Sequence, residues 1–135
     1  MNNSNIVHNI KEFTSDDIRW MKVAINYARH GIGLTGKNPS VGCVIVKNNQ
    51  ILGIGRTSNE GRPHAEENAL SIAGNNSKNA SLYVTLEPCA HKEQHVSCME
   101  KIVKAKIKKV VIACSDPDQR TNGKAIQFFL SKNIL

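Results

Sequence analysis

The chain has 135 residues, of which 40% are hydrophobic and 4% aromatic, and its formal net charge is +7. This length suits one compact domain and is too short for two ordinary ones, so we expect a single domain over residues 1–135. No run of 18 apolar residues is present, which excludes a helix that spans a membrane. The few aromatic side chains argue against a surface that stacks single-stranded bases, and we expect no nucleic-acid partner.

The first dozen residues, 1–12, are polar and rich in asparagine. They lack the basic start and the apolar stretch of a signal peptide, so we expect a flexible tail and a cytoplasmic protein with no membrane partner. Four cysteines in such a protein are typical of metal ligands or buried thiols rather than of disulfides.

The first predicted elements are a helix and a hairpin. Thr14 and Asp17 form the pattern of an N-terminal helix cap, and apolar residues then recur at helical spacing, which predicts a helix over 15–30. Residues 41–46 are almost all apolar and rich in valine, the pattern of a buried strand. A turn then leads into a returning strand over 51–55.

A second helix is predicted around a short motif that carries two candidate site residues. Pro63 is expected to lie in its first turn, where proline is tolerated, together with His64 and Glu66. Gly74 is expected to end this helix. The following residues, 75–79, are polar and predict a mobile loop.

A third strand over 82–86 is predicted to end just before Cys89. Ser97 and Glu100 then form the pattern of a capping box, so a third helix is predicted to begin with Cys98. The unpaired N–H groups at a helix start favour negative charge, which favours the thiolate form of Cys98.

The last elements are a fourth strand over 109–114 and a helix marked by Ile126, Phe129 and Leu130. Residues 134–135 are predicted to begin a further strand. An antiparallel hairpin followed by strands that are reached through helices predicts an α/β domain whose helices cover a mixed sheet.

One set of residues in these elements predicts a catalytic zinc site. His64, Cys89 and Cys98 would supply three protein ligands and leave the fourth tetrahedral position for water, whose pKa zinc lowers to about 7. Glu66 lies two residues after the histidine and would carry protons between water, ring nitrogen and leaving amine. Each residue alone is more often structural, but the combination favours a zinc-dependent deaminase of nucleobases.

The remaining cysteines, histidines and lysines give weaker signals. Cys43 and Cys114 lie in or at the end of apolar strands and are interpreted as small core residues. His91 and His95 lie between the two cysteine ligands and could compete for the metal. The lysines near the third helix predict a solvated face or, alternatively, attraction to phosphate; they are Lys101, Lys104, Lys106, Lys108 and Lys109.

Over residues 17–134 the sequence resembles a known family. The motifs are those at 38–43, 63–66, 83–89 and 116–117, with the eight-residue gap between the two cysteine ligands. In these motifs the chain is similar to the deaminase domain of the bifunctional riboflavin-biosynthesis deaminase/reductase, in the cytidine-deaminase-like superfamily. The tRNA-adenosine and cytosine deaminases instead place their cysteines two residues apart. The resemblance implies a three-layer α/β/α sandwich with a central mixed sheet.

The resemblance also implies a substrate and its contacts. The substrate would be a diaminopyrimidinone with a ribosylamino 5′-phosphate, whose ring 2-amino group is hydrolysed with release of ammonia. Zn²⁺ would be held by the three ligands named above. The side chains expected to touch the substrate are Asn38, Thr57, His91, Gln94, Asp116 and Asp118. The family usually has histidine, lysine and asparagine where Thr57, Gln94 and Asp118 stand.

No glycine-rich dinucleotide motif is present, so we expect that the reductase half is absent and that a separate reductase could act beside this chain. Superfamily resemblance implies a homodimer or a larger assembly. Two alternatives stay open: a deaminase for another nucleobase or nucleotide, and a zinc-stabilised binding module with little activity. Glu66 argues against the second, because a purely structural zinc does not need it.

Overall fold

The computed structural model describes residues 13–90, 96–117, 122–132 and 134. The expected tail at 1–12 lies outside the described residues. The helices are α2 (Ser15–Arg29), α3 (Ala65–Ala73), α4 (Cys98–Lys104) and α5 (Lys124–Ser131), with 3₁₀ turns η1 (Asn59–Gly61) and η2 (Gly74–Ser77). The strands are β1 (Gly42–Lys47), β2 (Gln50–Arg56), β3 (Ser81–Val84) and β4 (Lys109–Ile112). Among the described residues, no helix is both long and apolar enough to cross a membrane.

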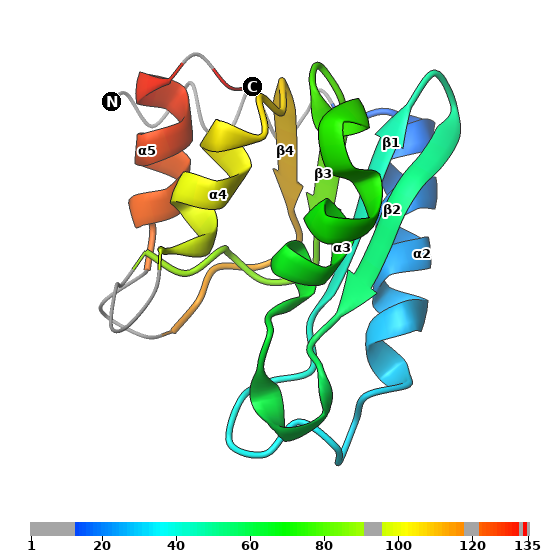
Figure 1. Cartoon of the computed structure of the whole chain (residues 1–135), viewed down its shortest axis with the longest axis vertical. Helices are drawn as coiled ribbons and strands as arrows, with labels where there is room; N and C mark the ends of the chain where they lie inside the picture. Colours follow the sequence, from blue (N-terminus) through cyan, green and yellow to red (C-terminus); the bar gives the residue numbers. More distant parts are fainter. Residues whose placement is uncertain (1–12, 91–95, 118–121, 133, 135) are drawn as a thin grey trace.

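The strands form one mixed sheet in the order β2-β1-β3-β4 (Figure 1). β1 pairs antiparallel with β2 and with β3, whereas β3 pairs parallel with β4. Asn48 and Asn49 connect β1 to β2 with φ angles of 51° and 62°. Positive φ at both central residues is the requirement of the hairpin turn that matches the twist of paired strands. The predicted hairpin and mixed sheet are therefore confirmed.

Side chains of β1 alternate between two separate cores. Cys43 and Ile45 lie in a cluster with residues of α3, α4 and α5. Val44 and Val46 lie in a second cluster with residues of α2. Figure 1 shows α2 on the face of the sheet opposite to α3. A strand buried on both faces explains the nearly continuous apolar run in the sequence, and the predicted three-layer arrangement is confirmed.

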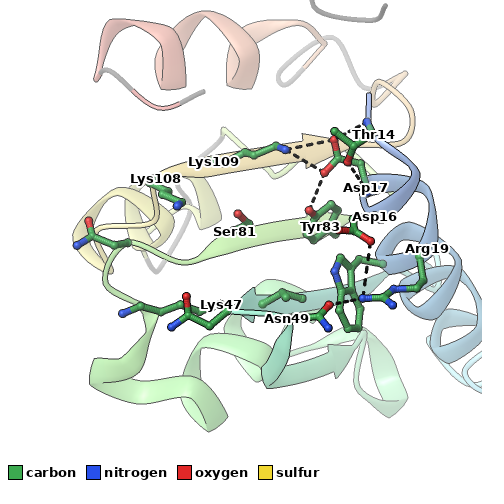
Figure 2. A pocket seen from close by; sticks show the side chains of 14 residues that line it. Thr14, Asp16, Asp17, Arg19, Lys47, Asn49, Ser81, Tyr83, Lys108 and Lys109 are labelled. Atoms are coloured by element: carbon green, nitrogen blue, oxygen red, sulfur yellow. Dashed lines mark hydrogen bonds and ion pairs between the residues drawn. The ribbon is translucent and has the colours of Figure 1, made fainter. Parts of the chain in front are cut away.

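The cap of α2 does more than begin a helix. The Thr14 and Asp17 side chains each accept the other residue's backbone N–H at 3.1 Å. Asp17 is also 3% exposed and accepts hydrogen bonds from the Tyr83 hydroxyl (2.7 Å) and from Lys109 Nζ (2.9 Å) (Figure 2). Burial raises the pKa of Asp17, but the hydrogen bonds from Lys109 and Tyr83 outweigh burial and leave the pKa below its ordinary value. This carboxylate thus ties α2 to β3 and β4.

The structure corrects three local predictions. α3 begins at Ala65 with His64 as its N-cap in an extended conformation, so Pro63 lies before the helix and not in its first turn. The expected polar loop after α3 begins instead with the 3₁₀ turn η2, in which Ser77 is buried. Cys114 is exposed, because β4 ends two residues earlier at Ile112. Cys43, by contrast, is a core residue as predicted.

Candidate active site

Three potential metal donors meet at the ends of three different elements. His64 caps α3, Cys98 is the first residue of α4, and Cys89 lies in the segment that follows β3. Their ligand atoms all lie within 4.8 Å of one another. Both cysteines are buried, and the histidine is half-buried. The structure therefore brings together the three residues that the sequence singled out as ligands.

The spacing of these donors suits zinc. His64 Nδ1 and Cys98 Sγ are 3.5 Å apart. Typical Zn–N and Zn–S bond lengths in a tetrahedral site place nitrogen and sulfur ligands about 3.5 Å apart. One imidazole and two thiols are also a donor set that zinc prefers, and three protein donors leave one coordination position open. Among the described residues, the cluster thus offers three donors, the number typical of a catalytic zinc site.

Hydrogen bonding makes Cys89 the more acidic of the two thiols. Its sulfur accepts the Cys98 backbone N–H at 3.3 Å. A hydrogen bond from the Cys98 side chain and another from His64 lower the pKa of Cys89 to about 4 against the opposing effect of burial. The pKa of Cys98 is raised, because its thiol donates to Cys89 and is buried. Hydrogen bonds from Cys98 and His64 thus favour the thiolate form of Cys89, and the thiolate form of Cys98 stays a prediction.

Glu66 lies in the first turn of α3 and is 4% exposed. Burial raises its pKa to about 7, although its own backbone N–H and the nearby His64 favour the charged form. A carboxyl group with a pKa near 7 can take up and release a proton at neutral pH, which is the property that general acid–base catalysis needs. Glu66 is thus placed beside the donor cluster in a form suited to proton transfer.

Glu67 is a supporting residue that the sequence analysis did not identify. Its carboxylate accepts the His64 backbone N–H at 3.2 Å and pairs with Arg62 (3.3 Å) and with Lys101 of α4 (2.7 Å). Burial raises the pKa of Glu67, but the hydrogen bonds from Lys101 and from His64 N–H leave it lowered. Its place three residues after the N-cap is the signal that could have revealed it. Glu67 therefore ties the start of α3 to α4.

Two predicted substrate contacts are held by hydrogen bonds to the backbone. The Asn38 amide donates to the Gly61 carbonyl at 2.9 Å. The Thr57 hydroxyl donates to the Pro39 carbonyl (3.0 Å) and accepts the Val41 N–H (2.9 Å), and its residue is 2% exposed. These bonds show that Thr57 fastens the segment before β1 to the end of β2. Contact of either side chain with a substrate stays a prediction.

Of the other predicted substrate contacts, only Asp116 lies among the described residues. Asp116 is half-buried, and its backbone N–H donates to the Glu87 carboxylate at 3.2 Å. His91, Gln94 and Asp118 fall outside the described residues, as does the possible competitor His95.

One depression on the described surface lies away from this cluster. It has a volume of about 510 Å³ and is lined by residues at the starts of β3 and β4, the β1–β2 turn and the start of α2 (Figure 2). Ser81 and Lys109 begin the two strands there. The donor cluster lies beyond the other end of β3, so this depression belongs to a different end of the sheet.

A comparison with known families supports the chemistry of the cluster. The family model for the cytidine and deoxycytidylate deaminase zinc-binding region matches residues 14–114. The chain belongs to this family of zinc-dependent deaminases. The matched region includes all three candidate ligands and Glu66, and membership assigns zinc as the cofactor of the family's site.

The chain is similar to proteins of riboflavin biosynthesis within this family. A protein of Buchnera aphidicola subsp. Acyrthosiphon pisum named diaminohydroxyphosphoribosylamino-pyrimidine deaminase is 42% identical over 119 residues, which cover 88% of this chain and 81% of that protein. The RibD riboflavin biosynthesis protein of Haemophilus influenzae is 43% identical over 123 residues, 91% of this chain and 33% of that protein. The chain thus spans about a third of the length of this RibD relative.

Solved structures show the same fold. RibD of Acinetobacter baumannii superposes with a TM-score of 0.83 at 47% identity, over 87% of this chain and 33% of that one. A deoxycytidylate deaminase of the cyanophage S-TIM5 superposes with a TM-score of 0.67 at 23% identity, over 90% of this chain and 96% of that one. The cytidine-deaminase-like fold expected from the sequence is confirmed.

Proposed function

We propose that this chain hydrolyses the ring amino group of diaminohydroxyphosphoribosylaminopyrimidine, with release of ammonia, in riboflavin biosynthesis. The observation that carries this proposal is the buried Glu66 beside three convergent metal donors. The substrate follows from the Buchnera relative, of which this chain covers 81%. Resemblance in the motifs around Asn38 and Asp116 supports the same substrate.

Each residue of the cluster would have a defined role. His64, Cys89 and Cys98 would hold Zn²⁺, which when bound supplies a Lewis acid that makes water nucleophilic near neutral pH. The Glu66 carboxylate would take a proton from the attacking water and pass it to the ring nitrogen. It would then take the remaining proton of the new hydroxyl group and pass it to the amine, which leaves as ammonia. Burial raises the pKa of this carboxyl group above its ordinary value, which suits it to proton transfer near neutral pH.

The remaining parts of the proposal concern substrate and partners. Asn38 and Asp116 would contact the substrate, together with Thr57, His91, Gln94 and Asp118. The net charge of +7 would favour approach of a phosphorylated substrate. A reductase would consume the product, since a Thermotoga maritima relative is named as both a deaminase and a reductase. Homo-oligomerisation and a cytoplasmic location stay predictions.

The test is ammonia release by the zinc-loaded chain. Diaminohydroxyphosphoribosylaminopyrimidine should be turned over in preference to deoxycytidylate, cytosine, guanine and adenosine, and Glu66→Gln should abolish the signal while keeping zinc. Turnover of another base with none of the phosphorylated pyrimidine would reject the substrate and keep deaminase chemistry. No turnover of any of them by a zinc-loaded chain would instead favour a zinc-stabilised binding module.

A further inference from the structure

Glu87 is a buried carboxylate with partners far along the chain. It is 2% exposed and lies two residues before Cys89. Its Oε1 accepts the backbone N–H groups of Asp116 (3.2 Å) and Gly123 (3.0 Å), and its Oε2 accepts that of Ala125 (3.0 Å). A carboxylate that accepts several backbone N–H bonds in a buried place makes strong, directional contacts. Three chain positions are therefore fixed by one side chain.

Two of these bonds form the cap of α5. Gly123 is the N-cap of this helix, has a φ of 75° and has no side chain that could accept an N–H bond. Glu87 supplies the missing acceptor from another part of the chain, and its negative charge also suits the positive end of the helix dipole. Ala125 is fully buried in the larger core cluster. The cap thus sets where α5 docks.

The third bond reaches the segment after β4. The Glu87 backbone N–H also donates to the Cys114 carbonyl at 2.9 Å, so main chain and side chain of one residue both hold this segment. Figure 1 shows the segment that follows β3 running beside the segment that follows β4. These bonds consequently fix the position of Asp116 relative to Cys89, one of the three metal donors.

We propose that Glu87 is the positioning residue that sets Asp116 and the first turn of α5 relative to the metal-binding Cys89. The inference rests on the proposed function, because Asp116 is expected to contact the substrate. Glu87 itself would touch neither metal nor substrate. It would act through Asp116, so its loss should weaken substrate binding more than the chemical step.

The experiment uses Glu87→Gln in the zinc-loaded full chain. The amide keeps one acceptor oxygen but replaces the other with an NH₂ group, which cannot accept an N–H bond. We expect unchanged zinc content, amide hydrogen exchange about tenfold or more faster in the peptide spanning 114–126, and a KM raised by about tenfold or more. The kcat should change by no more than about threefold.

Asp17→Asn is the matched control, because Asp17 is also a buried carboxylate but lies at the other end of the sheet. It should lower stability and leave KM and the exchange of the 114–126 peptide unchanged. Asp116→Ala tests whether Glu87 acts through Asp116, because a merely structural role of Glu87 would give independent effects on KM. Its effect on KM should be non-additive with that of Glu87→Gln, because Glu87 acts through Asp116.

KM is measured on whichever base the wild-type chain deaminates. Failure of the proposed substrate would appear in the wild type, whereas failure of this inference appears only as a difference between wild type and variant. Uniformly faster exchange, an unchanged KM, or additive effects with Asp116→Ala would overturn the positioning role. If Glu87→Gln does not fold, Glu87→Asp keeps both carboxylate oxygens but withdraws them by one methylene group, and the same exchange and KM changes are required of it.

Discussion

Replacing Asp17 with asparagine should remove a substantial part of the stability of this protein at neutral pH. The carboxylate accepts hydrogen bonds from Tyr83 (2.7 Å), from Lys109 (2.9 Å) and from the Thr14 backbone (3.1 Å). Its own side chain is 4% exposed, whereas that of Lys109 is 32% exposed. Asparagine keeps one oxygen but loses the charge, so the ion pair and one acceptor disappear.

The expected loss in the free energy of unfolding is larger than for breaking an exposed ion pair and smaller than for breaking a fully buried one. Hydrogen bonds to charged groups contribute about 1.5–3 kcal/mol each, and breaking a fully buried pair costs about 3–5 kcal/mol. Because Lys109 reaches solvent, we expect the free energy of unfolding to fall by about 2–4 kcal/mol. With an unfolding entropy of about 2.1 cal/mol/K per residue, a chain of 135 residues should lose about 7–14 °C in Tm.

The stability lost in Asp17→Asn should become smaller as the pH falls. The pKa of Asp17 is lowered in the folded protein by Lys109 and Tyr83 despite the opposing effect of burial. A lowered folded-state pKa contributes stability that is fully present above the unfolded pKa, about 3.9, and is lost as the pH falls through the folded value. The difference between wild type and Asp17→Asn should therefore be constant from pH 8 to about pH 5 and shrink below about pH 4.

Urea unfolding of both proteins across this pH range measures the difference directly, and subtraction cancels protonation of the metal ligands. Asp16→Asn is the matched control. Its side chain is 70% exposed and lies 3.9 Å from Arg19, so the change should stay within about 0.5 kcal/mol. An Asp17→Asn cost below about 1 kcal/mol at pH 7, or a cost that grows on acidification, would refute the reasoning.

Two further predictions concern the cluster itself. Protein purified without added metal should contain about one zinc per chain by elemental analysis. Cys98→Ala should lose this zinc, whereas Cys114→Ser, at an exposed thiol, should keep it. Metal loss in both variants or in neither would contradict the ligand assignment. Glu66→Gln should keep zinc and fold but lose about 10²–10⁴-fold in turnover, measured by ammonia release. Near-full turnover with normal zinc content would show that Glu66 has another role.

Short-range patterns account for what the sequence predicted well. Thr14 with Asp17 marked the start of α2, and Ser97 marked the start of α4 with Cys98 as its first residue. Such caps depend on residues three apart, so they are visible in the sequence. The three candidate ligands stand out in the sequence because zinc chemistry restricts residue type, although His64 and Cys98 lie 34 positions apart.

Long-range partners account for what the sequence did not reveal. Asp17 was identified as a cap, but its bond to Lys109 joins positions 92 residues apart. Glu87 was part of a motif without a role, because its N–H donors lie 29 to 38 residues further along the chain. The apolar run that ends at Cys114 predicts a core residue, because such a run does not show where the strand ends. These features depend on which elements the fold places side by side.

Close packing of α3 on β2 gives the last prediction. Gly53 and Gly55 both lie in β2, where their missing side chains let the helix approach. A Cβ atom at Gly55 would lie 2.5 Å from the Ala65 carbonyl oxygen and 2.6 Å from the Ala69 nitrogen. A Cβ atom at Gly53 would instead collide with the Ala69 carbonyl and approach Ala73, later in the same helix. The two glycines therefore support different turns of α3.

Gly55→Ala should push the first turn of α3, and His64 with it, away from the sheet, whereas Gly53→Ala should displace the later turns. Overpacking of this kind costs about 1–3 kcal/mol, so both variants should lose comparable stability in urea unfolding. Zinc affinity, measured by competition with a chelator, should fall by about tenfold or more in Gly55→Ala alone, as is typical when the support of a metal ligand is disturbed. Equal zinc loss in both variants would mean that zinc affinity follows global stability. The 3.5 Å separation of His64 Nδ1 from Cys98 Sγ would then not depend on how the first turn of α3 packs against Gly55.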